Sequence, residues 1–293
     1  MITRRSERAA VAAMVLATLL WGGTFVAIRD SVRALTPAAL VFGRFAVAAV
    51  LFTLVAIARR RVPDRSSIAV GVGNGALMAG SFFLQAAGLR STSAGSSAFL
   101  TCAGTLFAAF YAWALLRQRP APSLLAGIAL ALAGSAIMSL DGALHLGRGE
   151  LLTLAGASLY ALQIVWIARH ADSLEPLSLV TVQVVVVALL LAPFAGDVRT
   201  AYGALRGGGW LQFAYLAVAG SSIAPLLQIM AQRRLSPGRV GLLFALEPVF
   251  ALLFALTLGA ERFAPRWWAG AALILAAVVL VEWRAAAKER AAD

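Results

Sequence analysis

The chain has 293 residues, of which 61% are hydrophobic and 13% are charged, and its formal net charge is +12. A soluble domain carries roughly a quarter charged residues, so this composition and a mean hydropathy of +0.86 indicate a membrane protein. The Arg residues stand in short groups between apolar runs, so the positive charge does not indicate nucleic-acid binding. The single cysteine, Cys102, excludes an intrachain disulfide, and His145 and His170 are too far apart for a local metal motif.

Ten apolar runs follow one another along the chain, each about as long as the 20 residues that a helix needs to cross a membrane. The connections between them are short, and none resembles a boundary between soluble domains. We therefore predict an all-α membrane protein with ten transmembrane helices. The predicted spans are residues 9–28, 37–58, 67–89, 94–116, 122–140, 150–168, 176–195, 209–231, 238–258 and 265–283.

The distribution of Arg and Lys predicts the orientation of these spans. If the N-terminus is cytoplasmic, the inner segments hold 16 of the 25 Arg and Lys residues and the outer segments hold 8. Inner loops of membrane proteins carry the excess of positive charge. Both termini are therefore expected in the cytoplasm.

The two halves of the chain repeat each other. A shift of 139 places Pro37 on Pro176, and a shift of 143 places Gln85 on Gln228. The shift of 143 also aligns other polar, Pro and Gly residues: Ser93 with Ser236, Arg119 with Arg262, Pro122 with Pro265 and Gly127 with Gly270. We predict two five-helix repeats, residues 1–145 and 146–293. Because five is odd, the second repeat is inverted in the membrane, an architecture typical of alternating-access transporters.

Several short motifs resemble a known family. They are Trp21-Gly22-Gly23-Thr24-Phe25, Pro37 followed by Arg44, Glu247-Pro248-Val249-Phe250, and then Glu261 and Gly270. In this order they resemble the drug/metabolite transporter superfamily, and within it the ten-helix EamA-type exporters. The resemblance covers nearly the whole chain and is greatest to bacterial exporters of aromatic and other amino acids. The first half departs from the pattern, with Gly104-Thr105 in place of Glu247-Pro248 and Gln118 in place of Glu261, so a carboxylate role belongs to the second half alone.

Polar and aromatic side chains that share a helix face are the candidates for a solute pathway. Met78, Phe82 and Gln85 lie on one face of the third span, and Gln163 and Trp166 lie one turn apart on the sixth. Such residues also pack in cores, and Trp often anchors a helix at the membrane surface. We expect the third, fourth, sixth and eighth spans to line one central cavity. The predicted substrate-binding residues are Trp21, Met78, Phe82, Gln85, Phe99, Gln163, Trp166 and Gln228.

Arg44 and Glu247 are the only charged residues deep within the predicted spans. A charge at that depth costs a few kcal/mol unless it faces a cavity or a partner. Pro248 also removes a backbone donor, which a spanning helix tolerates only where protein or water surrounds it. Two readings remain: a structural Arg44–Glu247 pair, or an Arg44 that extends outward and a Glu247 that exchanges protons during transport.

The expected function is export of small metabolites, neutral and aromatic amino acids first, across the bacterial inner membrane. The alternatives are a drug or phosphorylated-metabolite exchanger, or a scaffold or receptor that transports nothing. A phosphorylated substrate would need several buried cations, and only Arg44 is available. No enzyme motif occurs, and we expect no cofactor, no metal and no nucleic-acid partner. The expected partners are a small solute and the lipid bilayer, with the protein as a monomer or a homodimer.

Overall fold

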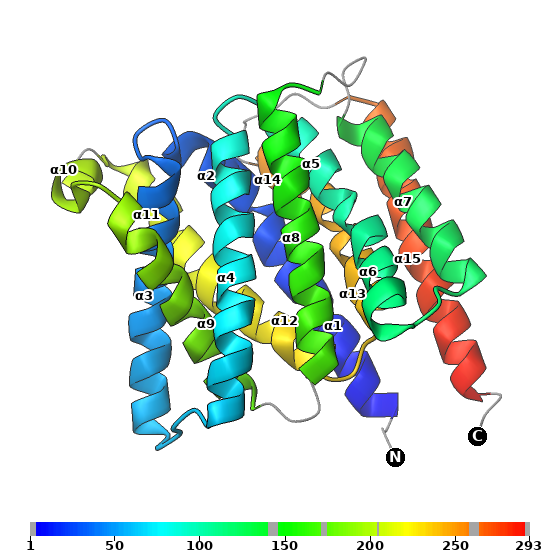
Figure 1. Ribbon diagram of the computed structural model, residues 1–293. Helices are drawn as coiled ribbons and strands as arrows, with labels where there is room; N and C mark the ends of the chain where they lie inside the picture. The colour runs from blue at the N-terminus through cyan, green and yellow to red at the C-terminus, as the bar shows by residue number, and fades with distance from the viewer. Residues whose placement is uncertain (1–3, 140–145, 171–174, 204, 258–263, 291–293) are drawn as a thin grey trace.

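The computed structural model describes residues 4–139, 146–170, 175–203, 205–257 and 264–290, and in these segments the chain forms helices only (Figure 1). The first half comprises α1 (Arg4–Gly22), α2 (Thr24–Ser31), α3 (Pro37–Ala58), α4 (Arg65–Gly88), α5 (Ala94–Cys102), α6 (Gly104–Leu116) and α7 (Pro122–Ser139). The second half comprises α8 (Arg148–His170), α9 (Pro176–Leu191), η2 (Ala192–Phe194), α10 (Val198–Gly203), α11 (Gly208–Tyr215), η3 (Leu216–Ile223), α12 (Ala224–Gln232), α13 (Pro237–Phe244), α14 (Glu247–Thr257) and α15 (Arg266–Arg290).

The spans follow the predicted order. Within the described segments, nine helical spans have the length and hydropathy to cross a membrane, and the shorter apolar helix Pro122–Met138 occupies the fifth position. α1 begins and α15 ends on the same side of the bundle, whereas α7 ends and α8 begins on the opposite side (Figure 1). The two halves therefore enter the membrane region from opposite sides. The predicted all-α architecture with two inverted repeats is confirmed.

Equivalent spans of the two halves begin in the same way. α3 starts at Pro37, and the Thr36 side chain accepts a hydrogen bond from the backbone N–H of Ala39 at 3.1 Å. α9 starts at Pro176, and the Glu175 carboxylate accepts from the N–H of Ser178 at 2.7 Å. A capping acceptor satisfies an otherwise unpaired N–H at the helix start, and proline in the first turn has no N–H to satisfy. These local signals explain why both spans begin where the sequence predicts.

Four of the spans are interrupted rather than continuous. The first breaks at Gly23, the fourth at Ala103, and the ninth between Phe244 and Glu247. The eighth contains the wide π-helical stretch Leu216–Ile223, just before Pro225. Proline lacks an N–H, so the turn before Pro225 and the turn before Pro248 each lose a backbone hydrogen bond.

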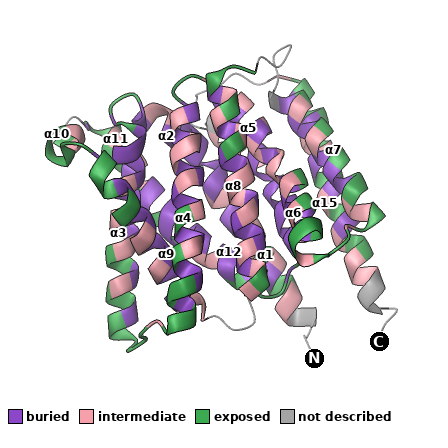
Figure 2. Cartoon of the chain, viewed as in Figure 1, coloured by how far each residue is buried: buried purple, intermediate pink, exposed green. Residues whose placement is uncertain are grey.

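Three of the four interruptions lie in the most buried spans. In an apolar 18-residue window of each span, 61% of the residues are buried for Ser6–Ser31, Gly208–Gln232 and Pro237–Phe254, against 33% for Ala94–Leu116 and 22% for Arg266–Ala287. In Figure 2 the buried residues likewise concentrate on the helices in the middle of the bundle, while α15 and the lower end of α3 carry many exposed positions. Non-helical backbone at membrane depth is tolerated only where protein or an internal cavity surrounds it.

Small residues let the helices approach closely. A Cβ on Gly134 of α7 would lie 2.5 Å from the carbonyl oxygen of Gly270 on α15. A Cβ on Gly22 of α1 would lie 2.5 Å from the Cβ of Phe250 on α14. Glycine at such crossings permits backbone contact that any larger residue would prevent. The second contact sets α1 against α14, beside the central cavity.

Candidate functional site

A cavity of about 40 Å³ lies in the middle of the bundle. Its walls come from α1, α2, α4, α5 and α6 of the first half and from α8, α13 and α14 of the second. By the same measure a water molecule needs roughly 10–15 Å³, so the cavity has room for a few waters. Three of the four helix breaks border it, because residues on both sides of Gly23, Ala103 and Ala245 line its wall.

Four aromatic rings in contact with one another form one side of the cavity. Trp21 stacks on Phe244 with ring centroids 5.1 Å apart, and Tyr160 meets Phe244 edge-to-face at 5.1 Å. Phe82 extends the cluster to Tyr160 at 6.1 Å. The polar atoms are already engaged, since Trp21 Nε1 donates to the carbonyl oxygen of Gly220 at 2.9 Å and the Tyr160 hydroxyl donates to Gln228 Oε1 at 2.8 Å. The aromatic cluster therefore offers the cavity ring surfaces rather than hydrogen-bond donors.

Hydroxyl side chains form much of the remaining wall, and their protons point back to the helix backbone. Thr24 donates to the carbonyl of Trp21 at 2.7 Å and Ser81 to that of Gly156 at 2.8 Å. Thr101 and Thr153 donate to carbonyls one turn earlier in their own helices, at 2.9 and 3.0 Å. A hydroxyl has one proton, so each of these groups has only lone pairs left to offer a solute.

Glu247 supplies the carboxyl group of the described cavity wall. It is the first residue of α14, where the helix N-terminus favours a carboxylate, and only 5% of its surface is exposed. No hydrogen bond or ion pair joins its side chain to another residue in the described part of the chain. Among the described lining residues there is no Lys, Arg or His. A buried carboxyl group that lines a cavity and has no partner among the described residues is a candidate binding group.

Comparison with known proteins gives the family. The model of the EamA-like transporter family matches residues 8–140 and, a second time, residues 147–283. The chain belongs to the EamA-like transporter family. The double match agrees with the two repeats, while the division at residues 145 and 146 stays a prediction.

Curated relatives of this EamA-family protein carry transporter names. An "Uncharacterized transporter" of Archaeoglobus fulgidus is 27% identical over 271 residues, covering 92% of this chain and 85% of the relative. The "Uncharacterized inner membrane transporter YedA" of Escherichia coli (strain K12) is 27% identical over 274 residues, covering 90% and 87%. A solved structure titled "Crystal structure of protein" superposes with a TM-score of 0.76 at 19% identity, covering 93% of this chain and 95% of the other, which supports the fold. These findings indicate a membrane transporter rather than an enzyme, and they name no substrate.

Some of the predicted substrate-binding residues line the cavity of this EamA-family protein. Trp21, Phe82 and Gln85 do so, as does Glu247. The third, fourth and sixth spans contribute to the wall as expected. The prediction for the eighth span is wrong, because none of its described residues lines the cavity. The first and ninth spans contribute to the wall instead. The interrupted first and ninth spans form this part of the wall, and α12 packs against α1 outside the cavity.

Other predicted residues lie outside the cavity wall. Gln228 and Gln163 are fully buried behind Tyr160, and Gln228 Nε2 donates to Gln163 Oε1 at 3.1 Å. Trp166 lines a separate groove, and its Nε1 donates to the carbonyl of Val70 at 3.1 Å. Met78 belongs to the hydrophobic core, and Phe99 is a half-buried residue of α5. Their binding roles stay predictions.

Several lining residues were not predicted as binding residues. Tyr160 and Phe244 belong to the aromatic cluster, and the hydroxyl residues Ser81, Thr101, Thr105 and Thr153 belong to the wall. The sequence does indicate Tyr160 as a pathway candidate, because it lies at helical spacing from Gln163 and Trp166 on the sixth span, and its ring lies 5.9 Å from that of Trp21. Ser and Thr in an apolar helix carry little signal, since their hydroxyls can bond to the preceding turn on any face.

Arg44 has partners other than Glu247. Its Nε donates to Ser221 Oγ at 2.5 Å, in the π-helical stretch of the eighth span. Its guanidinium carbon lies 4.9 Å from the ring centroid of Phe82 and 5.4 Å from that of Phe45. Nη2 is buried without a hydrogen-bond partner among the described residues. Of the two readings, the Arg44–Glu247 pair is absent from the described ion pairs, and Arg44 does not extend outward either, since it is fully buried.

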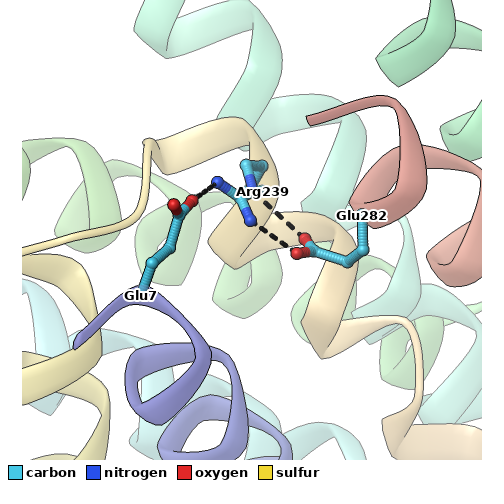
Figure 3. Close-up of polar contacts among 3 residues, drawn as sticks. All are labelled: Glu7, Arg239 and Glu282. Atoms are coloured by element: carbon cyan, nitrogen blue, oxygen red, sulfur yellow. Dashed lines mark hydrogen bonds and ion pairs between the residues drawn. The ribbon is translucent and has the colours of Figure 1, made fainter. Parts of the chain in front are cut away.

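An ion cluster ties three spans together on the side of the bundle where α1 begins. Arg239 of α13 bonds through Nη2 to Glu282 of α15 at 2.5 Å and through Nη1 to Glu7 of α1 (Figure 3). All three side chains are largely buried, with 15–21% of their surface exposed. On the opposite side, Glu150 of α8 accepts from the Thr92 hydroxyl at 2.5 Å. The Arg239 cluster therefore ties α1 and α13, which both line the cavity, to α15.

Proposed function

We propose that the protein is a secondary transporter or facilitator that exports small metabolites across the bacterial inner membrane, with neutral and aromatic amino acids as the first candidates. The observation that carries this proposal is the central cavity, because both inverted repeats contribute to its wall. Exchange of conformation between inverted repeats can expose one site to either side of the membrane in turn.

The size of the cavity fits a closed state of such a cycle. At about 40 Å³ it is too small for an amino acid, so the surrounding helices must separate to admit one. The breaks at Gly23, Ala103 and Ala245 border the cavity, and interrupted helix segments are places where backbone angles can change. In this proposal the Arg239 cluster opens on the cytoplasmic side when solute enters.

The lining chemistry favours an amphipathic solute. The aromatic cluster suits an apolar or aromatic group, and the hydroxyls and Glu247 suit a polar head. A phosphorylated metabolite is disfavoured, because no described cation lines the cavity to balance its charge. Apolar drugs remain an alternative, supported by the same aromatic cluster.

The orientation of the termini and the coupling of transport to proton exchange belong to the same proposal. The Arg and Lys distribution supports cytoplasmic termini, and the printed name of the E. coli relative supports the inner membrane. Glu247 is the residue proposed to exchange a proton during transport, since it faces the cavity and is free of ion pairs to other described residues. The proposed transporting unit is a monomer or a homodimer.

Flux in reconstituted vesicles tests the proposal. A panel of neutral amino acids, amines and phosphorylated compounds is followed with and without a pH gradient. We expect saturable flux of one or more aromatic or neutral amino acids that protein-free vesicles lack. No flux of any compound in the panel would favour the scaffold or receptor alternative.

A further inference from the structure

We propose that the cavity recognises its solute by the ammonium group, with Glu247 as the counter-ion, and that it accepts amines that carry no carboxylate. This inference rests on the proposed function, because it assumes that the solute occupies this cavity. It deepens that function by naming which part of an amino acid is recognised. It also extends the substrate class to aromatic and aliphatic amines.

The first step is the balance of hydrogen-bond acceptors and donors in the wall. Thr24, Ser81, Thr101 and Thr153 use their only protons on backbone carbonyls, so they present lone pairs. Glu247 adds a carboxyl without a bonded partner among the described residues. An ammonium group has three N–H donors and no acceptor. It therefore matches a wall that is rich in acceptors.

The second step is the shortage of groups that could hold a carboxylate. Trp21 Nε1 and the Tyr160 hydroxyl are both already donating elsewhere. The lining donors without a partner among the described residues are the Thr105 hydroxyl and the Gln85 amide. Arg44 contacts the ring of Phe82 but does not line the cavity, so a carboxylate would face Glu247 with no cation in the described wall. Like charges in a desolvated site repel by several kcal/mol.

The third step is the aromatic cluster. A cation above an aromatic ring is attracted by the ring's negative face, and the attraction is larger where water is excluded. Trp21, Tyr160, Phe82 and Phe244 all line the cavity that holds Glu247. The chain already uses this interaction on its own cation, since the Arg44 guanidinium lies 4.9 Å from the centroid of Phe82. An organic ammonium beside these rings would be attracted both by the Glu247 carboxylate and by the ring faces.

The test compares ligands that share one side chain and differ in charge. Purified full-length protein in detergent is titrated with phenethylamine, phenylalaninamide, phenylalanine and 3-phenylpropionate, and binding is measured by calorimetry. Binding is preferred to flux here because uncharged amines cross a bilayer unaided. We expect the two carboxylate-free amines to bind at least as tightly as phenylalanine, and phenylpropionate to bind about tenfold or more weakly than either amine.

Two variants assign the effect to one residue. Glu247→Gln keeps the shape and removes the charge, and it should weaken both amines by about tenfold or more while changing phenylpropionate little or strengthening it. Asp64→Asn is the control, because Asp64 caps α4 outside the cavity and Asn caps a helix equally well. The control should bind all four ligands as the natural chain does.

The outcomes separate this inference from the proposed function. Tighter binding of phenylpropionate than of phenethylamine, or amine binding that Glu247→Gln leaves unchanged, overturns the inference. So does a lack of binding by all four ligands. The proposed function is decided by the flux panel alone: amino-acid flux without amine binding would retain transport and reject ammonium recognition.

Discussion

The guanidinium of Arg44 lies 4.9 Å from the ring centroid of Phe82, and its Nε donates to Ser221 at 2.5 Å. Arg44 thus joins α3 to the π-helical stretch of the eighth span and to a ring of the cavity wall. Glu247, the other ionisable residue predicted deep within a span, lines the cavity from α14. The two buried charges have separate surroundings, and their mutational effects should separate in the same way.

We expect the stability effects of Arg44→Gln and Glu247→Gln to add. Arg44→Gln removes the ring contact and the bond to Ser221 and should lower the melting temperature in detergent. Because the two side chains share no contact, the double variant should differ from the sum by no more than about 0.5 kcal/mol. Recovery of stability in the double variant would instead show a direct Arg44–Glu247 pair.

Glu247→Gln should abolish the response of flux to a pH gradient. The amide fills the same space but cannot bind or release a proton at neutral pH. Vesicle flux at equal and unequal pH on the two sides measures the effect, and the melting temperature confirms that the variant is folded. Normal flux with a normal pH response in this variant would rule out the coupling role.

Gly22→Ala should destabilise the protein and reduce transport. A Cβ at this position would lie 2.5 Å from Phe250 Cβ and 2.9 Å from the backbone nitrogen of Ala251, so α1 and α14 must move apart beside the cavity. Gly203→Ala is the matched control, because its Cβ would meet no atom within 4 Å. Thermal unfolding of the two variants gives the comparison, and equal melting temperatures would contradict the close contact.

Arg239→Gln should destabilise the closed conformation. It removes the cation that both the Glu7 and the Glu282 carboxylates contact, where all three side chains have little exposure, at a cost on the order of 2 kcal/mol. Adding Glu7→Gln and Glu282→Gln should recover part of this loss, because both carboxylate charges are then removed. Melting temperatures report the stability, and the accessibility of Thr105→Cys in a Cys102→Ala background reports cavity opening. A triple variant no more stable than Arg239→Gln would show that the two carboxylate charges are not the cause.

Cysteine labelling tests the orientation. Cys102 is buried and is the chain's single cysteine, so Cys102→Ala gives a background without reactive thiols. New cysteines at Ser66, expected on the cytoplasmic side, and at Arg90, expected outside, should react with an impermeant reagent in intact cells only at position 90. Labelling at position 66 instead would reverse the topology.

The sequence by itself determined the number, order and inversion of the spans. A chain in hydrocarbon must satisfy its backbone within helices, and each crossing takes about 20 apolar residues, so run length alone indicates a span. Pro37 and Pro176 mark the starts of equivalent helices, and the repeated pairs revealed the two halves. Pro248 indicated a lost backbone hydrogen bond in the ninth span, and the structure interrupts that span between Phe244 and Glu247.

Only the tertiary structure decided which side chains meet. Spans that are apolar on every side have no polar face to indicate which way they turn. Phe82 and Phe99 therefore look alike in the sequence, yet one lines the cavity and the other does not. The hydroxyls of Thr101 and Thr153 bond to their own helices wherever they point, so their place in the wall depends on how α5 and α8 pack. Arg44 and Glu247 could have paired or not, and the crossing of α3 with the eighth span placed Ser221, rather than the carboxylate, at the guanidinium.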